Sequence, residues 1–147
     1  MTTTTTAARS DADFTVDCGG AQVRAHYRHL ATVVAVRGRI DAGNVDQISD
    51  HARRFILSGE PLVLDLSGVN SFAAPGIWLL CVLDGDCLAA GVEWTLVESP
   101  AVHELLRDFD EEAKFPISAS VDQALHTLAE GIDRRRQLLL PLIRKTA

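Results

Sequence analysis

The stretch of sequence that decides the fold reads LVLDLSGVNSFAAPG and occupies residues 62–76. Its first five residues form a short apolar run, which is typical of a buried central strand. We expect a turn from Ser67 to Ala74. Pro75 then suits the first position of a helix, because its missing N–H is one that a helix start leaves unpaired anyway. A buried strand that leads through a turn into a helix predicts an α/β domain.

Two strand-like segments and a helix precede this stretch. In Ala21–Arg28 small and apolar residues alternate with polar ones, which predicts a half-buried strand. The Val-rich segment Thr32–Ile40 predicts a second strand, paired with the first as a hairpin. Asn44 has the properties of a helix N-cap, with Gln47 as its capping-box partner. The helix that follows carries an apolar face at spacings of three and four residues.

Further elements follow residue 76. The helix predicted over Pro75–Ala90 is apolar all round in its first two turns, so it must be covered on more than one side. Val92–Val97 predicts a strand. Ser99 has the properties of a helix N-cap, and Val102, Leu105, Leu106 and Phe109 are expected to line the helix that follows. Residues 115–117 could add a short edge strand, and a capping box at Ser120 opens the last helix.

This order of elements predicts an α/β fold with a mixed four- to five-stranded sheet and about four helices mainly on one face. Strands separated by helices pair in parallel through right-handed crossovers, and the opening hairpin makes the sheet mixed. We divide the 147 residues into a disordered N-terminal segment (1–13), one domain (14–132) and a basic, apolar C-terminal tail (133–147).

The composition of the chain and the absence of catalytic motifs limit the classes of function that we expect. A net charge of −6 argues against nucleic acid as a partner, because such binding depends on Lys and Arg. Three cysteines without metal-ligand spacing indicate reduced thiols and a cytoplasmic location, and we expect Cys81 and Cys87 to be buried structural thiols. We find no phosphate loop, nucleophile elbow or metal-ligand motif, so we expect no enzyme activity, cofactor or metal.

Three motifs together resemble the signature of STAS domains, specifically of anti-sigma-factor antagonists. They are the strand and turn at 62–76, the Gly38–Asp41 segment that is similar to the family's Gly-Glu-Leu-Asp, and the Ala90–Val92 junction. The resemblance covers about residues 14–132. It implies a partner-switching role, in which the protein binds an anti-sigma factor that is also a Ser kinase and so frees a sigma factor. Phosphorylation of a Ser in an Asp-Ser-Ser-Gly segment breaks that complex.

The chain departs from this pattern at the phosphorylation site. Counted back from Gly76, the positions of Asp, Ser and Ser hold Ala73, Ala74 and Pro75. Ala74 is therefore a degenerate phosphosite, because alanine has no hydroxyl group. Ser71 is a nearby hydroxyl that could take the phosphate instead, and we keep that as a hypothesis.

The resemblance implies a partner-binding surface on the loops after Ile40 and Val69 and on the first turn of the following helix. The candidate partner is an anti-sigma factor or a kinase-like regulatory protein, bound without the usual phosphoswitch. Because the helix is apolar all round, Trp78 or Val82 is expected in a protein contact, which could be a homodimer. The candidate site residues are Asp41, Asn70, Ser71, Ala73, Ala74, Pro75, Gly76 and Trp78.

Two other functions stay open. One is an adaptor subunit of a membrane transport system, and a weaker one is a sensor of a small ligand or nucleotide. The tail contains Arg134–Arg136, an apolar cluster and Pro141. It could dock on a membrane, on its own domain or on a second subunit. Packing is favoured over membrane contact, because Pro141 is expected to interrupt any long helix.

Overall fold

The computed structural model of the chain describes residues 14–28 and 31–146. The N-terminal segment 1–13, predicted to be disordered, lies outside the described residues. The described elements, in chain order, are β1 (Phe14–Asp17), β2 (Ala21–Arg28), β3 (Ala31–Ile40), α1 (Val45–Ile56), β4 (Leu62–Phe72), α2 (Pro75–Ala90), β5 (Trp94–Val97), α3 (Pro100–Asp108), the short 3₁₀ helix η2 (Glu112–Lys114), β6 (Ile117–Ser118) and α4 (Val121–Thr146).

The strands form one mixed sheet in sequence order from β1 to β6. β1, β2 and β3 pair antiparallel, and β3 to β6 pair in parallel. The predicted α/β fold with a mixed sheet and four helices is confirmed. The sheet has six strands and not four or five, because the four-residue β1, which the sequence analysis missed, and the two-residue β6 extend its edges.

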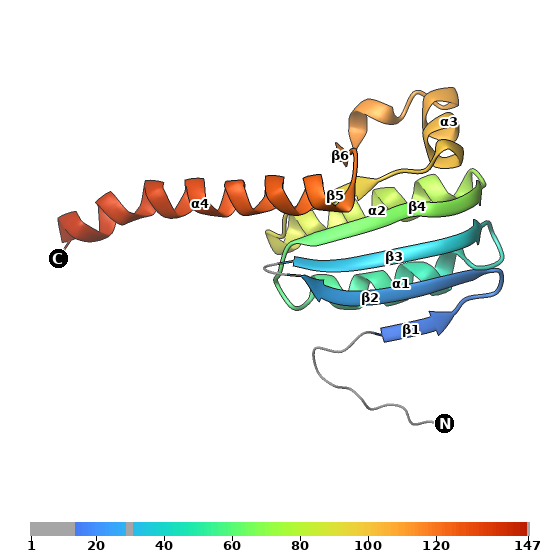
Figure 1. Ribbon diagram of the computed structural model, residues 1–147, viewed down its shortest axis with the longest axis horizontal. Coiled ribbons are helices and arrows are strands. Elements are labelled where there is room, and N and C mark those ends of the chain that lie inside the picture. The colour runs from blue at the N-terminus through green and yellow to red at the C-terminus, as the bar shows by residue number, and fades with distance from the viewer. Residues whose placement is uncertain (1–13, 29–30, 147) are drawn as a thin grey trace.

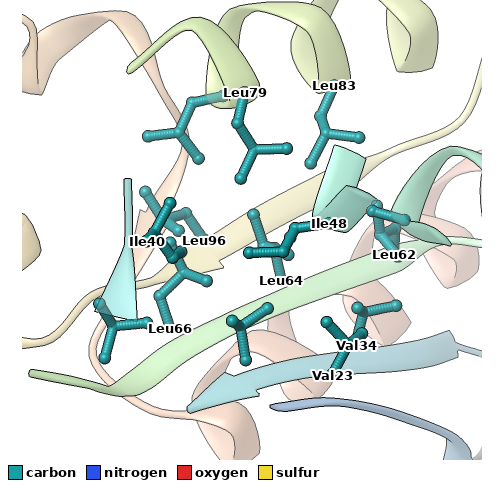
Figure 2. Packing of buried hydrophobic residues seen from close by; sticks show 14 of the residues in the cluster. Val23, Val34, Ile40, Ile48, Leu62, Leu64, Leu66, Leu79, Leu83 and Leu96 are labelled. Carbon is teal, nitrogen blue, oxygen red and sulfur yellow. The ribbon is translucent and has the colours of Figure 1, made fainter. Parts of the chain in front are cut away.

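The main core lies between the sheet and the helices α1, α2 and α3. Figure 2 shows Leu79 and Leu83 of α2 and Ile48 of α1 above the apolar side chains of β4. The buried residues that it labels are Val23, Val34, Ile40, Ile48, Leu62, Leu64, Leu66, Leu79, Leu83 and Leu96. The helices are thus mainly on one face, as predicted.

α4 covers part of the opposite face of the sheet (Figure 1). Its Ala124 and Leu128 form a second cluster with residues of β3, β4 and β5, among them Val33 and Val63. The Ser120 hydroxyl accepts a hydrogen bond from the Gln123 N–H at 3.1 Å, which confirms this helix start. The second cluster explains why Val63 and Leu64 are both buried although they point to opposite faces.

β4 is longer than expected, because it continues through the predicted turn to Phe72. Two register shifts against β3, between Ala35 and Arg37 and between Gly38 and Arg39, absorb extra residues of β4 as bulges. The Asp65 carboxylate accepts hydrogen bonds from the Ser67 N–H at 3.0 Å and the Ser67 hydroxyl at 2.6 Å. Turn-forming residues here shape a bulged strand and not a loop.

Three further predictions need correction. Asn44 does not cap α1 with its side chain. Phe109, expected to line the helix after Ser99, follows α3 and is 52% exposed, because α3 ends at Asp108. α4 continues through position 141 to Thr146, although proline was expected to interrupt it. Proline removes one backbone hydrogen bond, and a helix can continue past that position with a local bend.

Among the described residues, no helix combines the length and the apolar character that crossing a membrane requires.

Candidate protein-binding site

The candidate site lies where β3 and β4 end, at one edge of the sheet (Figure 1). The two strands pair in parallel up to Ile40 and Phe72. Beyond this pair, the Ala73 N–H donates a hydrogen bond to the Ile40 carbonyl group at 2.9 Å. The loop that begins at Asp41 and the junction at Ala73 and Ala74 therefore lie side by side, although they are more than thirty positions apart in sequence.

The carboxylate of Asp41 is bound within its own loop. It accepts a hydrogen bond from the Arg39 guanidinium at 2.7 Å and another from the Gly43 N–H at 2.9 Å. The hydrogen bond from Arg39 is the main reason that the pKa of Asp41 is lowered, and the Gly43 N–H adds to the effect. Asp41 thus fixes the shape of the loop as well as contributing charge to the surface.

Asn44 anchors this loop through three hydrogen bonds of its side chain. Its side chain is 1% exposed, accepts a hydrogen bond from the Asp41 N–H at 3.0 Å, and donates to the carbonyl groups of Arg39 at 2.7 Å and Gly19 at 3.1 Å. The side chain therefore joins the β1–β2 turn, the end of β3 and the start of α1. Sequence spacing favoured a helix cap instead, because the contact with Gly19 is 25 residues distant in sequence.

Backbone hydrogen bonds, without a capping side chain, stabilise the start of α2. Ala74 occupies the N-cap position without a capping side chain. The Gly76 and Ile77 N–H groups donate to the carbonyl groups of Ala73 at 2.8 Å and Ala74 at 2.9 Å, and Pro75 has no N–H to satisfy. The Ala74 methyl group is exposed, so this surface presents a small, uncharged side chain where the family pattern has a hydroxyl.

Gly76 allows the first turn of α2 to lie directly on Phe72. A Cβ atom at this position would be 2.3 Å from the ring of Phe72, closer than real side chains approach. Phe72 itself is 7% exposed and belongs to the core. The need for a glycine at position 76 is therefore steric.

Asn70 and Ser71 are neighbouring exposed residues near the end of β4. In a regular strand two neighbours point to opposite faces, but the second bulge falls here, and Ser71 pairs with Arg39. The Ser71 hydroxyl is therefore on the surface of the same edge as Ala74. That position is compatible with its being a phosphate acceptor, and this role stays a prediction.

The outward face of α2 is uncharged along its whole length. Trp78 is 51% exposed and Leu88 is 82% exposed. The two acidic residues of the helix, Asp84 and Asp86, have partners within the domain. Asp84 accepts a hydrogen bond from the Trp94 indole at 2.9 Å, and Asp86 forms an ion pair with Arg53. The exposed residues from the helix start to its last turn are Ala74, Trp78, Cys81, Gly85, Leu88, Ala89 and Ala90.

Cys81 was expected to be buried, but it is exposed on this outward face. Cys87, which was also expected to be buried, and Cys18 are buried. Partial burial raises the pKa of the Cys81 thiol, and the nearby charge of Glu111 adds to the effect. The charge of Lys114 acts on the same thiol in the opposite direction. Burial raises the pKa of the Cys87 thiol to about 12, so that thiol stays protonated.

The structure therefore brings most of the predicted site residues together. Asp41, Ala73, Ala74, Pro75 and Gly76 meet at one edge of the sheet, Asn70 and Ser71 precede them on β4, and Trp78 begins the uncharged face of α2.

Two residues of this region were not predicted as part of the site: Arg39, and Asn44 in its role as a loop anchor. Arg39 stands two residues before Asp41, which is a signal that could have indicated their ion pair. In the described part of the chain, no group of three His, Cys, Asp or Glu side chains could hold a metal ion.

The fold is similar to that of known anti-sigma factor antagonists. One solved structure, described as an anti-sigma factor antagonist from Mycobacterium paratuberculosis, matches with a TM-score of 0.62 and 21% identity, covering 81% of this chain and 96% of that one. The anti-sigma factor antagonist SpoIIAA in its unphosphorylated form matches with a TM-score of 0.55 and 16% identity, covering 78% and 96%. At these identities the likeness concerns the fold.

Residues 21–124 match the family model described as the STAS domain, and the chain belongs to this family. A relative named Osmosensory protein A, from Mycobacterium tuberculosis, is 54% identical over 158 aligned positions that cover the whole of both chains. STAS domains that resemble anti-sigma-factor antagonists are regulatory binding proteins and not enzymes, which agrees with the prediction from the sequence.

Proposed function

We propose that the chain binds an anti-sigma factor or a related kinase-like regulatory protein, and thereby regulates transcription by partner switching. The proposed contact surface consists of the loop after β3, the start of α2 and the outward face of α2. The observation that carries the proposal is the uncharged outward face of α2 with its half-exposed Trp78. A helix on the surface of a monomeric domain normally turns charged residues outward, and a continuous exposed apolar surface is typical of a protein-binding site.

We propose further that phosphorylation at position 74 does not control this binding. A phosphate at the start of α2 would add about −1.5 to −2 charges to a surface shaped for close packing. Ala73, Ala74 and Pro75 offer no hydroxyl group that could receive it. Formation of the complex then does not depend on phosphorylation at position 74. Ser71 is the residue at which a different phosphorylation could still control binding.

We place this regulation in the cytoplasm and in the response to osmotic change. The full-length relative at 54% identity is named as an osmosensory protein, which supports this setting. Deletion of the gene should change the induction of a set of sigma-dependent transcripts after a salt shift. An unchanged transcript profile would contradict a role in the osmotic response, but it would not contradict binding to an anti-sigma factor.

The binding proposal can be tested by affinity capture with three baits: the unmodified chain, Trp78→Glu and Tyr27→Glu. Tyr27 is a matched control, because it is 50% exposed, close to the 51% of Trp78, but lies on β2 away from α2. We expect the unmodified and Tyr27→Glu baits to recover an anti-sigma factor with an ATP-binding kinase-like domain from the cytosolic fraction. Trp78→Glu should lose it.

Two results of this experiment would contradict the proposal. Recovery of the same regulator by the Trp78→Glu bait would exclude the α2 face as the contact surface. Recovery of membrane transporter subunits from the membrane fraction, in place of a regulator, would favour the adaptor function instead.

A further inference from the structure

α4 continues well beyond the domain that it covers. Its Leu128 is 7% exposed within the second cluster, whereas Leu138, ten residues later, is 72% exposed. Figure 1 shows the helix passing the edge of the sheet as one rod and pointing away from the other elements. We call residues 134–146 of this helix the arm. It is roughly 20 Å long, at about 1.5 Å of rise per residue.

The arm differs in charge from the rest of the chain. The last 14 residues, 134–147, hold five of the 14 basic residues of the chain and no acidic one. The other residues therefore carry nine basic and all 20 acidic side chains, a formal charge of −11. A basic, leucine-rich helix attached to an acidic domain is attracted to other copies of that domain, and two arms would repel each other.

The arm leaves the domain at the edge where α1 and α2 end. Leu57, directly after α1, is 86% exposed, and Leu88, in the last turn of α2, is 82% exposed. A groove of about 520 Å³ between the two helix ends is lined by apolar groups of Ile56, Leu57, Ala89 and Ala90, and its two arginines, Arg53 and Arg54, are offset by Asp50 and Asp86. The carboxyl ends of both helices also carry partial negative charge, which favours a basic partner.

We infer that the arm docks on a second copy of this chain, in the groove between the ends of α1 and α2. The contact is reciprocal, so two copies related by a two-fold axis each supply one arm and one groove, and the assembly closes as a dimer. The reciprocal use doubles the area that one arm buries, which brings it toward the roughly 1,200 Å² of a stable interface. An anionic membrane is the less suitable occupant, because it would repel the acidic domain beside the arm.

This inference does not rest on the proposed function. The arm and the ends of α1 and α2 lie at the edge of the sheet where β3 and β4 begin, whereas the loop after β3 and the start of α2 lie at the edge where these strands end (Figure 1). The last turn of α2, with Ala89 and Ala90, belongs to both the groove and the outward face of α2. A dimer formed through the arms would leave the loop after β3 and the start of α2, with Trp78, accessible in both copies.

The test is the molar mass of the full chain by sedimentation equilibrium across a range of concentrations. We expect a monomer–dimer equilibrium whose dissociation constant rises at least about tenfold in Leu138→Glu and in Leu57→Glu, by loss of apolar contact and added repulsion. Phe109→Glu, a change at a 52% exposed side chain outside the arm and the groove, should leave the equilibrium unchanged. A mixture of the Leu138→Glu and Leu57→Glu chains should dimerise better than either alone, because it retains one intact arm–groove contact.

Three outcomes would overturn the inference. A chain that is monomeric at all concentrations contradicts it directly. Loss of dimerisation in Leu138→Glu but not in Leu57→Glu would mean that arms pair with arms. Sedimentation of a monomeric chain with vesicles containing anionic lipid, lost in Leu138→Glu, would assign the arm to a membrane surface.

Discussion

Two glycines of α2 show at the scale of single residues how the site is built. Gly76 has the ring of Phe72 in the place of a Cβ atom, whereas a Cβ atom on Gly85 would meet nothing within 4 Å. Gly76→Ala should therefore destabilise the fold by about 1–3 kcal/mol through overpacking. Gly85→Ala, in the same helix, should stabilise it by about 0.5–1 kcal/mol, because alanine favours helix. Urea unfolding of both variants checks the pair, and equal effects would contradict the steric role of Gly76.

Asn44 is the residue whose loss should loosen the loop of the site most. Its side chain is buried and makes three hydrogen bonds with backbone groups of Gly19, Arg39 and Asp41. Asn44→Ala leaves these groups without their partner, and we expect a loss of about 2–4 kcal/mol in the free energy of unfolding. Asp46→Ala, at an exposed position two residues later, is the control and should have a small effect. A small effect of Asn44→Ala as well would show that water replaces the side chain.

Asp41 makes the stability of the loop depend on pH. Its pKa is lowered in the folded protein, so its contribution is present above the pKa of the unfolded chain, about 3.9, and is lost as the pH falls through the folded value. The stability difference between the unmodified chain and Asp41→Asn should therefore be larger at neutral pH than in acid. Urea midpoints measured at neutral pH and near pH 3 compare the two, and a difference independent of pH would exclude an ionised role for Asp41.

At the scale of elements, Cys81 reports on the outward face of α2. It is exposed, whereas Cys18 and Cys87 are buried. Mass spectrometry after brief alkylation of the native protein should find modification at Cys81 alone. The reaction needs mildly alkaline conditions, because the pKa of Cys81 is raised and the thiolate is the reacting form. A bound partner should slow modification of Cys81, and an unchanged rate in the complex would place the partner elsewhere.

The elements also show how far the sequence alone predicts the fold. Alternating or periodic apolar residues predicted β2 and α1, and a short apolar run predicted the buried core of β4. Pro75, Ser99 and Ser120 marked the starts of α2, α3 and α4, because proline and capping residues favour helix starts. These patterns did not indicate β1, which is short and mostly exposed, and they ended β4 too early, at Leu66. Ser67, Gly68, Asn70 and Ser71 are typical of turns, and pairing with β3 together with two bulges overrides that local preference.

Prediction of the site was limited by contacts between distant parts of the chain. The family pattern indicated the junction at Ala73–Gly76, and the structure places Asp41 beside it. The hydrogen bond from Asn44 to Gly19 could not be predicted, because no local pattern encodes which loop lies opposite. Cys81 was expected to be buried for the same reason: a helix that is apolar all round does not reveal which side a partner covers.

At the scale of the whole molecule, the domain separates two surfaces. The uncharged face of α2 starts at the edge where β3 and β4 end, and the arm of α4 leaves at the opposite edge (Figure 1). An acidic domain with a basic arm can assemble with itself through one edge while it binds a regulator at the other. Substitutions at Trp78 and at Leu138 should therefore act independently, since sites far apart with no shared contacts have additive effects.

Calorimetry of the purified chain with the captured anti-sigma factor, with and without ATP, tests the proposed contact surface at the start of α2. We predict that ATP leaves the affinity unchanged, because position 74 cannot be phosphorylated, and that Ala74→Glu and Trp78→Glu each weaken binding at least about tenfold. Tyr27→Glu should bind like the unmodified chain. Loss of affinity of the unmodified chain after incubation with ATP, or full affinity of Ala74→Glu, would contradict an uncharged and unswitched contact surface at the start of α2.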